Sequence, residues 1–586
     1  MKKYYKRYLI LFIIGVIANV VVDYVQLYIP EFLGDMVDIV SLNTNVIFDD
    51  IKKIVYSLII VAFTLFIGRI IMRFTILVAS SKIDRDIRHD MFLKTERLSQ
   101  RYFHENKVGS IMSSFTTDIE AIGDFTGWGT VMIIDALFLG VMALYKMIKL
   151  DMFLTMITLI PMLALIVWGN KVEKAMSDKW TERQKSFDKL FDFTQENFTG
   201  IRVIKAFVKE AQEFKAFSKV AKENSDVNID FAMMSARFDV CIELLIGAVV
   251  ALLMGLGGTC VYYYVTGNPV VLFGHSIILT AGKLVTFIGY VDVLIWPMIA
   301  MGQILQMFSR FKSSSKRVFD YLDEEEEIHN IDNPVSLDDC KGEISFNHFS
   351  FIYPDGSNES LKDISFKINP GELIGVVGKI GSGKTTLVNS LLRLYNIEKN
   401  QIFIDGVDIM DLDIKSLRDN IAYVPQDNFL FSSTVQENIA FSNKRMSIDK
   451  VKSAANFADV HENITNFKDG YNTMTGERGV TLSGGQKQRI SIARAYAKDA
   501  PIMIMDDSVS AVDVKTEEAI LSNIQKKRAG KTTIIIASRI STVSKADRIL
   551  VLKDGELEAF DSPENLLKVS PTYQKMVYLQ KLESEL

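Results

Sequence analysis

The sequence has little from which a disulfide framework, a metal-binding cluster or a nucleic-acid surface could be built. Its only cysteines, Cys241, Cys260 and Cys340, have neither a paired pattern nor the spacing of metal ligands. The formal net charge is −5, and no cluster of basic residues is interleaved with aromatic residues. We therefore interpret the cysteines as packing residues and expect no nucleic acid among the partners.

Apolar residues are abundant, but they are distributed unevenly along the chain. At 586 residues the chain is too long for one hydrophobic core. Long apolar runs recur up to about residue 310, whereas the part after about residue 340 has the pattern of an α/β domain. A helix needs about 20 apolar residues to cross about 30 Å of hydrocarbon. Six segments approach that length and predict membrane-spanning helices: 8–29, 54–79, 127–149, 152–169, 240–265 and 284–309.

The basic residues predict how these helices are oriented. Lys2, Lys3, Lys6 and Arg7 precede the first span, which places the N-terminus in the cytoplasm. The segments 82–107 and 171–222 are rich in Lys and Arg and are also expected inside. An even number of spans returns the chain to the cytoplasm, so both termini are predicted to be cytoplasmic.

The two long cytoplasmic connections have apolar residues at helical spacing. The second span is expected to continue to about Arg101, so a helix over 54–101 would be roughly 70 Å long. Near the tips of the two projections lie the segments 116–122 and 196–202. Both are suited to docking on another domain, and the alternative is an ordinary helical hairpin tip.

An acidic, turn-rich segment separates the apolar half from the rest of the chain. It covers 323–341 and contains four consecutive glutamates, Glu324 to Glu327. We interpret it as a solvated linker. The chain is thus predicted to have a helical transmembrane domain over 1–322, this linker, and an α/β domain over 342–586.

The α/β domain contains a phosphate-binding pattern. A short apolar strand at 373–377 leads into G-x-x-x-x-G-K-[ST], with Gly378, Gly383, Lys384 and Thr385 at the fixed positions, and a helix is expected to follow. In this arrangement backbone N–H groups and a helix N-terminus hold phosphates. Lys384 would neutralise the β/γ charge and Thr385 would bind Mg²⁺. Nucleotide binding is therefore predicted.

A second motif identifies the class of nucleotide-binding domain. The run Leu482-Ser483-Gly484-Gly485-Gln486 resembles the signature motif of the ATP-binding cassette (ABC) transporters. The resemblance covers essentially the whole chain. It implies a half-size exporter with a six-helix, all-α transmembrane domain, long cytoplasmic helical extensions and a C-terminal α/β P-loop ATPase domain.

Other residues match the family pattern in order, and their roles are what the resemblance implies. Tyr353 stands where an aromatic ring stacks on adenine, and Gln426 matches the glutamine that contacts Mg²⁺. Asp506 matches the Walker B aspartate, a further Mg²⁺ ligand beside Thr385. The segment 475–479 resembles the exporter-specific loop before the signature, and Asp513 lies in the D-loop. With ATP and Mg²⁺ as cofactors, the nucleotide-binding set is Tyr353, Gly378, Gly381, Ser382, Gly383, Lys384, Thr385, Thr386 and Gln426.

Two positions depart from the family pattern, and both concern hydrolysis. Asp507 stands where the family has the glutamate that polarises the attacking water, and Ser538 stands where it has a histidine that contacts the γ-phosphate. A carboxylate shortened by one methylene is withdrawn by roughly 1.5 Å, and a misplacement of about 1 Å can cost about 100-fold in rate. Slow hydrolysis is therefore expected at this chain's own Walker site, with Asp507, Ser538 and Asp506 at the catalytic positions.

The intact signature favours a heterodimer. In the sandwich that the family implies, each ATP lies between the glycine loop of one subunit and the signature of the other. Here Leu482 to Gln486 would complete a competent site on a partner subunit, as in bacterial heterodimeric multidrug exporters. A slow homodimer is the alternative.

The leading hypothesis is a subunit of an ATP-driven exporter that moves amphiphilic molecules across the cell membrane by alternating access. A non-hydrolysing regulatory subunit, a lipid flippase and a peptide exporter are alternatives. The charged residues in the spans have two interpretations: an acidic wall that favours cationic amphiphiles, or internal ion pairs and helix ends that lie in water. The second interpretation is favoured. These residues are Asp23, Arg69, Arg73, Asp135, Asp239, Glu243 and Asp292.

Overall fold

The structure is a computed structural model, and it divides the chain into two compact units. It describes residues 1–42, 48–267, 271–272, 275–276, 278–354, 356, 358–476, 479–510 and 512–585, without the side chains of residues 42, 162–174, 242, 271–272, 275–276 and 583–585. The first unit contains Met1–Leu93 and Gly109–Asp323. The second contains Lys94–Val108 and Glu324–Leu586.

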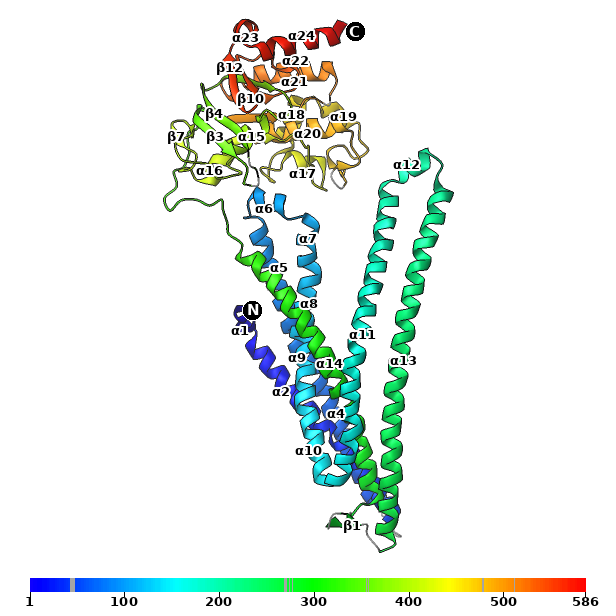
Figure 1. Cartoon of the computed structure of the whole chain (residues 1–586). Coiled ribbons are helices and arrows are strands. Elements are labelled where there is room, and N and C mark those ends of the chain that lie inside the picture. Colours follow the sequence, from blue (N-terminus) through cyan, green and yellow to red (C-terminus); the bar gives the residue numbers. More distant parts are fainter. Residues whose placement is uncertain are drawn as a thin grey trace. The chain divides into compact units, whose positions relative to one another are not determined.

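The first unit is built from long helices (Figure 1). Five helical stretches among the described residues are long and apolar enough to cross a membrane. The predicted span 152–169 begins α11, but its side chains beyond Pro161 lie outside the described residues, so only a shorter apolar helix, Met152–Pro161, is counted there. The five stretches are Leu9–Ser41, Phe48–Thr95, Val108–Leu150, Glu210–Val265 and Ala281–Asp323.

Several of these stretches are assembled from consecutive helical segments. The first comprises α2 and α3, the second comprises α4, η1 and α5, and the third comprises seven segments from α7 to α10. The bounds are α1 Lys2–Arg7, α2 Leu9–Gln26, α3 Tyr28–Leu42, α4 Phe48–Met72, η1 Arg73–Leu77, α5 Val78–Thr95, α7 Val108–Ser113, η2 Ser114–Asp118, α8 Ile119–Asp124, η3 Phe125–Gly129, α9 Thr130–Ile134, η4 Asp135–Leu139, α10 Gly140–Leu150, α11 Met152–Thr199, α12 Ile201–Ala206, α13 Glu210–Val265 and α14 Ala281–Asp323. The short strands β1 (Val271–Leu272) and β2 (His275–Ser276) pair antiparallel between α13 and α14.

The second long helix ends earlier than the sequence predicts. Helix α5 ends at Thr95 rather than near Arg101. Ser99 has extended backbone dihedrals, with φ −71° and ψ 160°, and is the N-cap of a separate helix, α6 (Gln100–Glu105). The expected single helix over 54–101 is therefore wrong at its C-terminal end.

The segment Lys94–Val108 lies in the helical half of the sequence but belongs to the second unit. It is held by the acidic linker. Lys94 Nζ lies 3.2 Å from Glu326 Oε1, and Arg101 Nη2 lies 2.5 Å from Glu327 Oε1. The buried hydroxyl of Ser99 donates to Glu327 Oε2 at 2.6 Å. The interpretation of the linker as fully solvated is therefore wrong for these two glutamates.

The two segments that are predicted to dock on another domain both belong to the first unit. The segment 116–122 belongs to the first unit, where Asp118 accepts hydrogen bonds from Ser314 and Arg317 of α14. The segment 196–202 ends α11 and begins α12, also in the first unit. Its Phe198 is exposed. Docking of these segments on another domain stays a prediction.

The second unit contains two sheets. A six-stranded sheet has the order β12-β11-β5-β10-β9-β8 and is parallel except for β12 at its edge, and a four-stranded antiparallel sheet has the order β4-β3-β6-β7. The strand bounds are β3 Ile344–Ile352, β4 Glu359–Ile368, β5 Leu373–Gly378, β6 Ile402–Ile404, β7 Val407–Asp408, β8 Ile421–Val424, β9 Ile502–Asp506, β10 Thr532–Ile536, β11 Arg548–Lys553 and β12 Glu556–Asp561. The main helices are α15 Lys384–Leu391, α16 Ile414–Asp419, α17 Val435–Ile439, α18 Ile448–Phe457, α19 His461–Thr465, α20 Gly484–Ala497, α21 Val514–Lys527, α22 Ile540–Val543, α23 Pro563–Val569 and α24 Pro571–Glu585.

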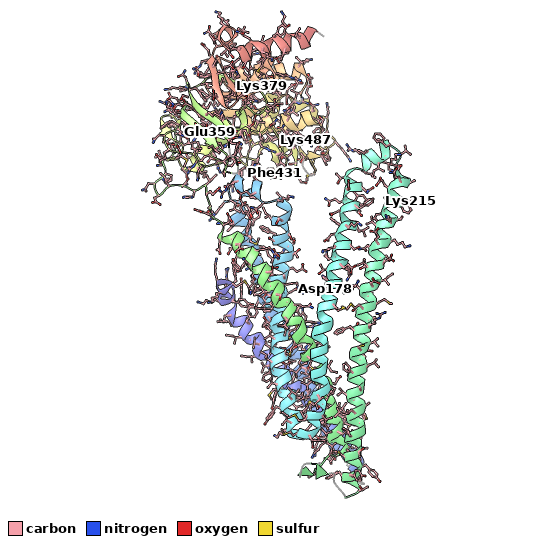
Figure 2. The ribbon with its side chains drawn as sticks, in the orientation of Figure 1. Asp178, Lys215, Glu359, Lys379, Phe431 and Lys487 are labelled. Atoms are coloured by element: carbon pink, nitrogen blue, oxygen red, sulfur yellow. The ribbon has the colours of Figure 1, made fainter. Side chains whose placement is uncertain are left out.

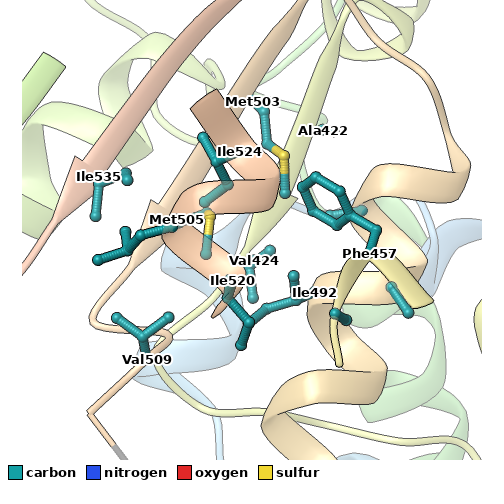
Figure 3. Close-up of a cluster of buried hydrophobic side chains, with 14 of the residues drawn as sticks. Ala422, Val424, Phe457, Ile492, Met503, Met505, Val509, Ile520, Ile524 and Ile535 are labelled. Carbon is teal, nitrogen blue, oxygen red and sulfur yellow. The ribbon is translucent and has the colours of Figure 1, made fainter. Parts of the chain in front are cut away.

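The central strands of the six-stranded sheet are buried on both faces. Every residue of β9 and β10 is buried, as expected for parallel strands covered on each side. The side chains on the two faces of the sheet belong to two hydrophobic clusters. Figure 3 shows one of them, in which Met503 and Met505 of β9 lie among side chains of α20 and α21. Ile502 and Ile504 belong to the other cluster, on the opposite face. This sandwiched sheet is a rigid support for the residues that follow its strands.

Candidate nucleotide site

The candidate site forms where three neighbouring parallel strands end. Strand β10 pairs with β5 on one side and β9 on the other. Because parallel strands end at the same edge of a sheet, the glycine loop after β5, Asp507 after β9 and Ser538 after β10 meet there. Crevices at the carboxyl ends of such strands are the usual ligand sites of α/β folds.

The residues meet around a cavity of about 570 Å³. Eleven of the predicted site residues line it: Tyr353, Gly381, Ser382, Gly383, Lys384, Thr385, Thr386, Gln426, Asp506, Asp507 and Ser538. The sequence-predicted nucleotide residues are thus brought together in one cavity, with Gly378 at the start of the loop.

Lys384 is the first residue of α15, and its side chain contacts the glycine loop that precedes it. Its Nζ donates to the carbonyl oxygens of Gly378 and Lys379, each at 2.9 Å. Burial lowers the pKa of the Lys384 ammonium, while the carboxylates of Asp506 and Asp507 oppose this shift. A cation held by carbonyls and partly desolvated is ready to exchange those contacts for a phosphate group.

Asp506 and Thr385 place two oxygen atoms side by side at the edge of the cavity. The hydroxyl of Thr385, in the first turn of α15, donates to Oδ2 of Asp506, at the end of β9, at 3.0 Å. Burial raises the pKa of Asp506, and the charge of Asp507 adds to the rise. A hydroxyl and a carboxylate oxygen placed together are a donor set that suits Mg²⁺, which prefers oxygen ligands and retains several waters.

The loop also fits a phosphate ligand. Ser382 is 2% exposed, and its hydroxyl oxygen is buried without a hydrogen-bond partner. Gly383, the N-cap of α15, has φ +94°, and the first turn of this helix contains no acidic residue. An unpaired hydroxyl beside a helix N-terminus can bind an anion. The residues present therefore fit both ATP and Mg²⁺.

The two residues that depart from the family pattern contact each other. The Ser538 hydroxyl donates to Asp507 Oδ1 at 3.3 Å. Asp507 has a left-handed backbone with φ +44°, and its N–H donates to Ile536 O at 2.9 Å. The carboxylate of Asp507 is thus drawn toward the end of β10, where an imidazole is absent. Slow hydrolysis at this site stays a prediction.

The signature residues form the start of α20. Ser483 is the N-cap, and its hydroxyl accepts from the N–H of Gln486 at 3.3 Å while the Ser483 N–H donates to Gln486 Oε1 at 3.0 Å. Leu482 is buried, which anchors the turn. A Cβ atom added to Gly484 would meet no atom within 4 Å, so the helix start is open. Lys487, labelled in Figure 2, continues the helix.

The other predicted residues have definite local partners. The Tyr353 hydroxyl and Thr386 Oγ1 are 3.0 Å apart, and the Tyr353 ring packs edge-on against Phe351 and Tyr395. Asp513 is the N-cap of α21 and accepts from Thr516 N at 3.0 Å. The predicted exporter-specific loop 475–479 is described except for Glu477 and Arg478, which lie outside the described residues, as does Ala511 of the D-loop.

The cavity contains residues that the sequence analysis did not single out. Asp554 and Gly555, in the turn between β11 and β12, line it, as do Glu359 and Ser360 at the start of β4. The Gly555 carbonyl accepts from Lys362 N at 2.8 Å, which joins the two segments. An Asp-Gly pair predicts a tight turn. Only the sheet order shows that this turn borders the phosphate loop.

Comparison with known proteins agrees with this geometry. The sequence model described as "ABC transporter transmembrane region" matches residues 12–298, and that described as "ABC transporter" matches residues 361–510. The chain belongs to the ABC transporter family.

Full-length relatives are known for this ABC transporter. It is 32% identical over 584 residues to the probable multidrug resistance ABC transporter ATP-binding/permease protein YheI of Bacillus subtilis (strain 168), covering 99% of this chain and 97% of the relative. It is 31% identical over 587 residues to the multidrug resistance-like ATP-binding protein MdlA of Escherichia coli (strain K12), covering 100% of this chain and 96% of the relative. It also resembles a solved bacterial Atm1-family ABC exporter with ATP bound, with a TM-score of 0.75, 24% identity and 98% of each chain covered.

The predicted fold class is confirmed by these matches. This ABC transporter has a helical transmembrane region fused to an ATP-binding domain, in the order that the signature implied. The family membership also confirms ATPase-coupled transport as its activity.

Proposed function

We propose that the chain is the slow subunit of a heterodimeric exporter that moves amphiphilic, drug-like molecules out of the cytoplasm by alternating access. The single observation that carries the proposal is the contact of Ser538 with Asp507 at an otherwise complete ATP cavity. The names of the relatives YheI and MdlA, both described as multidrug resistance proteins, support the substrate class.

Within the subunit we assign the binding roles to the residues of the cavity. Lys384, Ser382 and the N-terminus of α15 hold the phosphates, and Tyr353 packs against the adenine. Thr385, Gln426 and Asp506 hold Mg²⁺, which supplies positive charge for the phosphoryl oxygens when bound. Leu482 to Gln486 and Asp513 act on the nucleotide of the partner subunit.

The asymmetry between binding and hydrolysis supports a heterodimer. The binding groups converge on the cavity, but the carboxylate that would activate water is short and is hydrogen-bonded to a serine. In a homodimer both ATP sites would share this arrangement. In a heterodimer the ordered start of α20 completes a site whose glutamate and histidine come from the partner.

The membrane arrangement follows from the charged flanks and the family. We propose a multi-pass protein of a bacterial plasma membrane with six spans, 152–169 included, and both termini in the cytoplasm. The domain division at residues 322 and 342 is retained as the linear description, with 323–341 as the linker.

The test restores the two departing residues. The full chain is purified alone, and its ATPase rate is compared with that of the Asp507→Glu/Ser538→His double variant. If Asp507 and Ser538 limit the rate, the double variant hydrolyses ATP about 100-fold faster, because a misplacement of about 1 Å costs that much. A matched control is Asp554→Glu, which lengthens another carboxylate in the same cavity and also at positive φ. The control leaves the rate unchanged.

Two outcomes contradict the proposal. If the wild-type chain alone hydrolyses ATP as fast as the double variant, its site is not impaired. Addition of a second half-transporter with Glu and His at these positions should raise the rate, with hydrolysis lost on Ser483→Ala. If that added subunit hydrolyses equally well with Ser483→Ala, the chain is a regulatory subunit instead.

A further inference from the structure

Helix α2 carries a line of polar side chains on the face that it buries. Asn19, Asp23 and Gln26 follow one another at i, i+4 and i+7, so they share a face. Asn19 and Asp23 are only 2% and 3% exposed, whereas Ile10 and Ile17 of the same helix are 74% and 59% exposed. Ile10 and Ile17 are therefore exposed on the outer side of the helix, and Asn19 and Asp23 face the interior of the first unit.

A second carboxylate lies against this line. Asp135 begins η4, a π-helical turn of five residues inside the third membrane-spanning stretch. Its Oδ1 accepts from Asn19 Nδ2 at 2.8 Å, and its Oδ2 accepts from Trp296 Nε1 at 2.9 Å. Both donors are neutral, so they orient the Asp135 carboxylate without cancelling its charge. Single π turns inside α-helices are frequent at functional sites.

Asp23 has an unsatisfied oxygen atom. Its Oδ2 is buried and has no hydrogen-bond partner among the described residues. The charged groups whose fields act on Asp23 are Asp135 and Arg69. Arg69 instead donates through Nη2 to Gln26 Oε1 at 3.4 Å. The ion pairing that the sequence analysis favoured for the intramembrane charges is therefore not what satisfies Asp23.

Two neighbouring carboxylates at membrane depth are costly unless one of them is protonated or a positive charge joins them. We propose that Asp23 and Asp135, together with Trp296, form the site that receives the positively charged group of an organic cation. The Asp23 oxygen without a partner accepts that group, and Asp135 supplies the second negative charge. Trp296 is 43% exposed, so its indole ring is open to a cation–π contact.

This inference deepens the proposed function, on which it rests, because it names cationic amphiphiles as the molecules carried. Other acidic residues of the spans differ. Asp239, Glu243 and Asp292 are exposed. Only Asp23 among these carboxylates is both buried and left with an unpaired oxygen in the described part of the chain.

The experiment measures binding without ATP, so that it does not depend on hydrolysis. The full-length protein, assembled as it purifies, is placed in lipid nanodiscs and titrated with radiolabelled tetraphenylphosphonium, a permanent organic cation. Triphenylphosphine oxide, a neutral molecule of similar shape, is measured in parallel. Asp23→Asn and Asp135→Asn each remove one charge, and Asp239→Asn makes the same chemical change on α13 as a matched control.

The wild type is expected to bind the cation saturably. Asp23→Asn and Asp135→Asn each weaken cation binding by about tenfold or more, because each removes one partner of a desolvated charge contact. Binding of triphenylphosphine oxide is unchanged in both variants, which also shows that they are folded. Asp23→Glu, which keeps the charge, retains cation binding, and Asp239→Asn matches the wild type with both probes.

Three results overturn the inference. These are absence of saturable tetraphenylphosphonium binding to the wild type, cation binding by both Asn variants at wild-type affinity, and equal loss of the cationic and the neutral probe. ATPase rates of the same preparations separate this inference from the proposed function. Normal cation dependence with a fully active isolated chain would contradict only the heterodimer.

Discussion

Two helices of the second unit begin with glycine-rich sequences, but they present their N-termini differently. Helix α15 starts after Gly383, has no side-chain cap and borders a cavity that also contains Lys384 and Asp506. Helix α20 starts after Ser483, which closes a capping box with Gln486. The start of α15 thus lies in a cavity with charged groups, whereas the start of α20 is capped by its own side chains and is open to the outside.

The difference corresponds to the two surfaces that, in the sandwich implied by the family, contact one ATP: the glycine loop of one subunit and the signature of the other. The α15 site has a lysine, a hydroxyl without a partner and an acidic Mg²⁺ donor, so it is expected to bind ATP by itself. The residues at the start of α20 do not line the cavity of the α15 site. The N-terminus of α20 offers backbone N–H groups for an anion, so we expect it to act on a nucleotide that another surface holds.

The largest predicted effect concerns the glycines at the two helix starts. A Cβ at Gly383 would lie 2.5 Å from Leu361 Cδ2 and 2.8 Å from Ser360 O, at φ +94°. Gly383→Ala should therefore lower the free energy of unfolding by about 2–4 kcal/mol, through left-handed strain and overpacking. Thermal unfolding of the purified full chain measures this.

Gly484→Ala is the matched control. Its added Cβ meets no atom within 4 Å, and alanine is favoured over glycine in a helix by up to about 1 kcal/mol. The control should unfold at or slightly above the wild-type temperature. Equal destabilisation by the two substitutions would show that the helix starts do not differ as described.

The next effect concerns the lysines near the two helix starts. Lys384→Ala should weaken binding of a fluorescent ATP analogue to the isolated chain by about 100-fold, because a charged hydrogen bond to phosphate contributes about 2–3 kcal/mol. Lys487→Ala, in the first turns of α20, should leave this affinity unchanged. Equilibrium titration in the presence of Mg²⁺ provides the measurement. Comparable losses in both variants would contradict the assignment of the two sites.

A smaller effect is expected from the cap of α20. Ser483→Ala removes one of the two capping-box hydrogen bonds, which should cost about 1 kcal/mol of stability. Thr434→Ala removes the equivalent bond of the capping box on α17 and should cost the same. Only Ser483→Ala should also reduce ATP hydrolysis by the assembled exporter. Loss of activity in both variants would mean that helix stability, not the signature, limits hydrolysis.

The phosphate loop could be predicted because the strand at 373–377 and the glycine loop are adjacent in sequence and have a fixed spacing. Tyr353, Gln426 and Asp506 are distant in sequence and are predicted only from the family resemblance; the structure brings all of them together in one cavity. The contact between Ser538 and Asp507 could not be predicted, because it depends on the pairing of β9 with β10 and on the backbone of Asp507. The same holds for Asp554 and Gly555, whose turn reaches the cavity through the order of the sheet.

The helical part could be predicted in extent more than in contacts. Apolar length predicts the membrane-spanning helices, because burial in hydrocarbon requires it. Apolar length does not show where a long helix ends, and α5 ends at Thr95 since Ser99 begins another helix. It also does not show which polar groups inside the bundle meet. The partners of Asp135 come from α2 and α14, far apart in sequence.

The smallest predicted effect tests whether the segment 94–108 contributes to either helix start. Its Arg101 pairs with Glu327, and both side chains are partly exposed, so the pair is expected to contribute about 0.5–1 kcal/mol. Arg101→Glu and Glu327→Arg should each speed hydrogen exchange of 94–108, and the double variant, which restores opposite charges, should slow it again. ATP affinity at α15 should stay unchanged in all three. The pair Lys399–Asp411, at 2.5 Å elsewhere in the second unit, serves as the control swap and should leave 94–108 unaffected. Failure of the double variant to restore protection would mean that the buried Ser99–Glu327 hydrogen bond, not the ion pair, holds the segment.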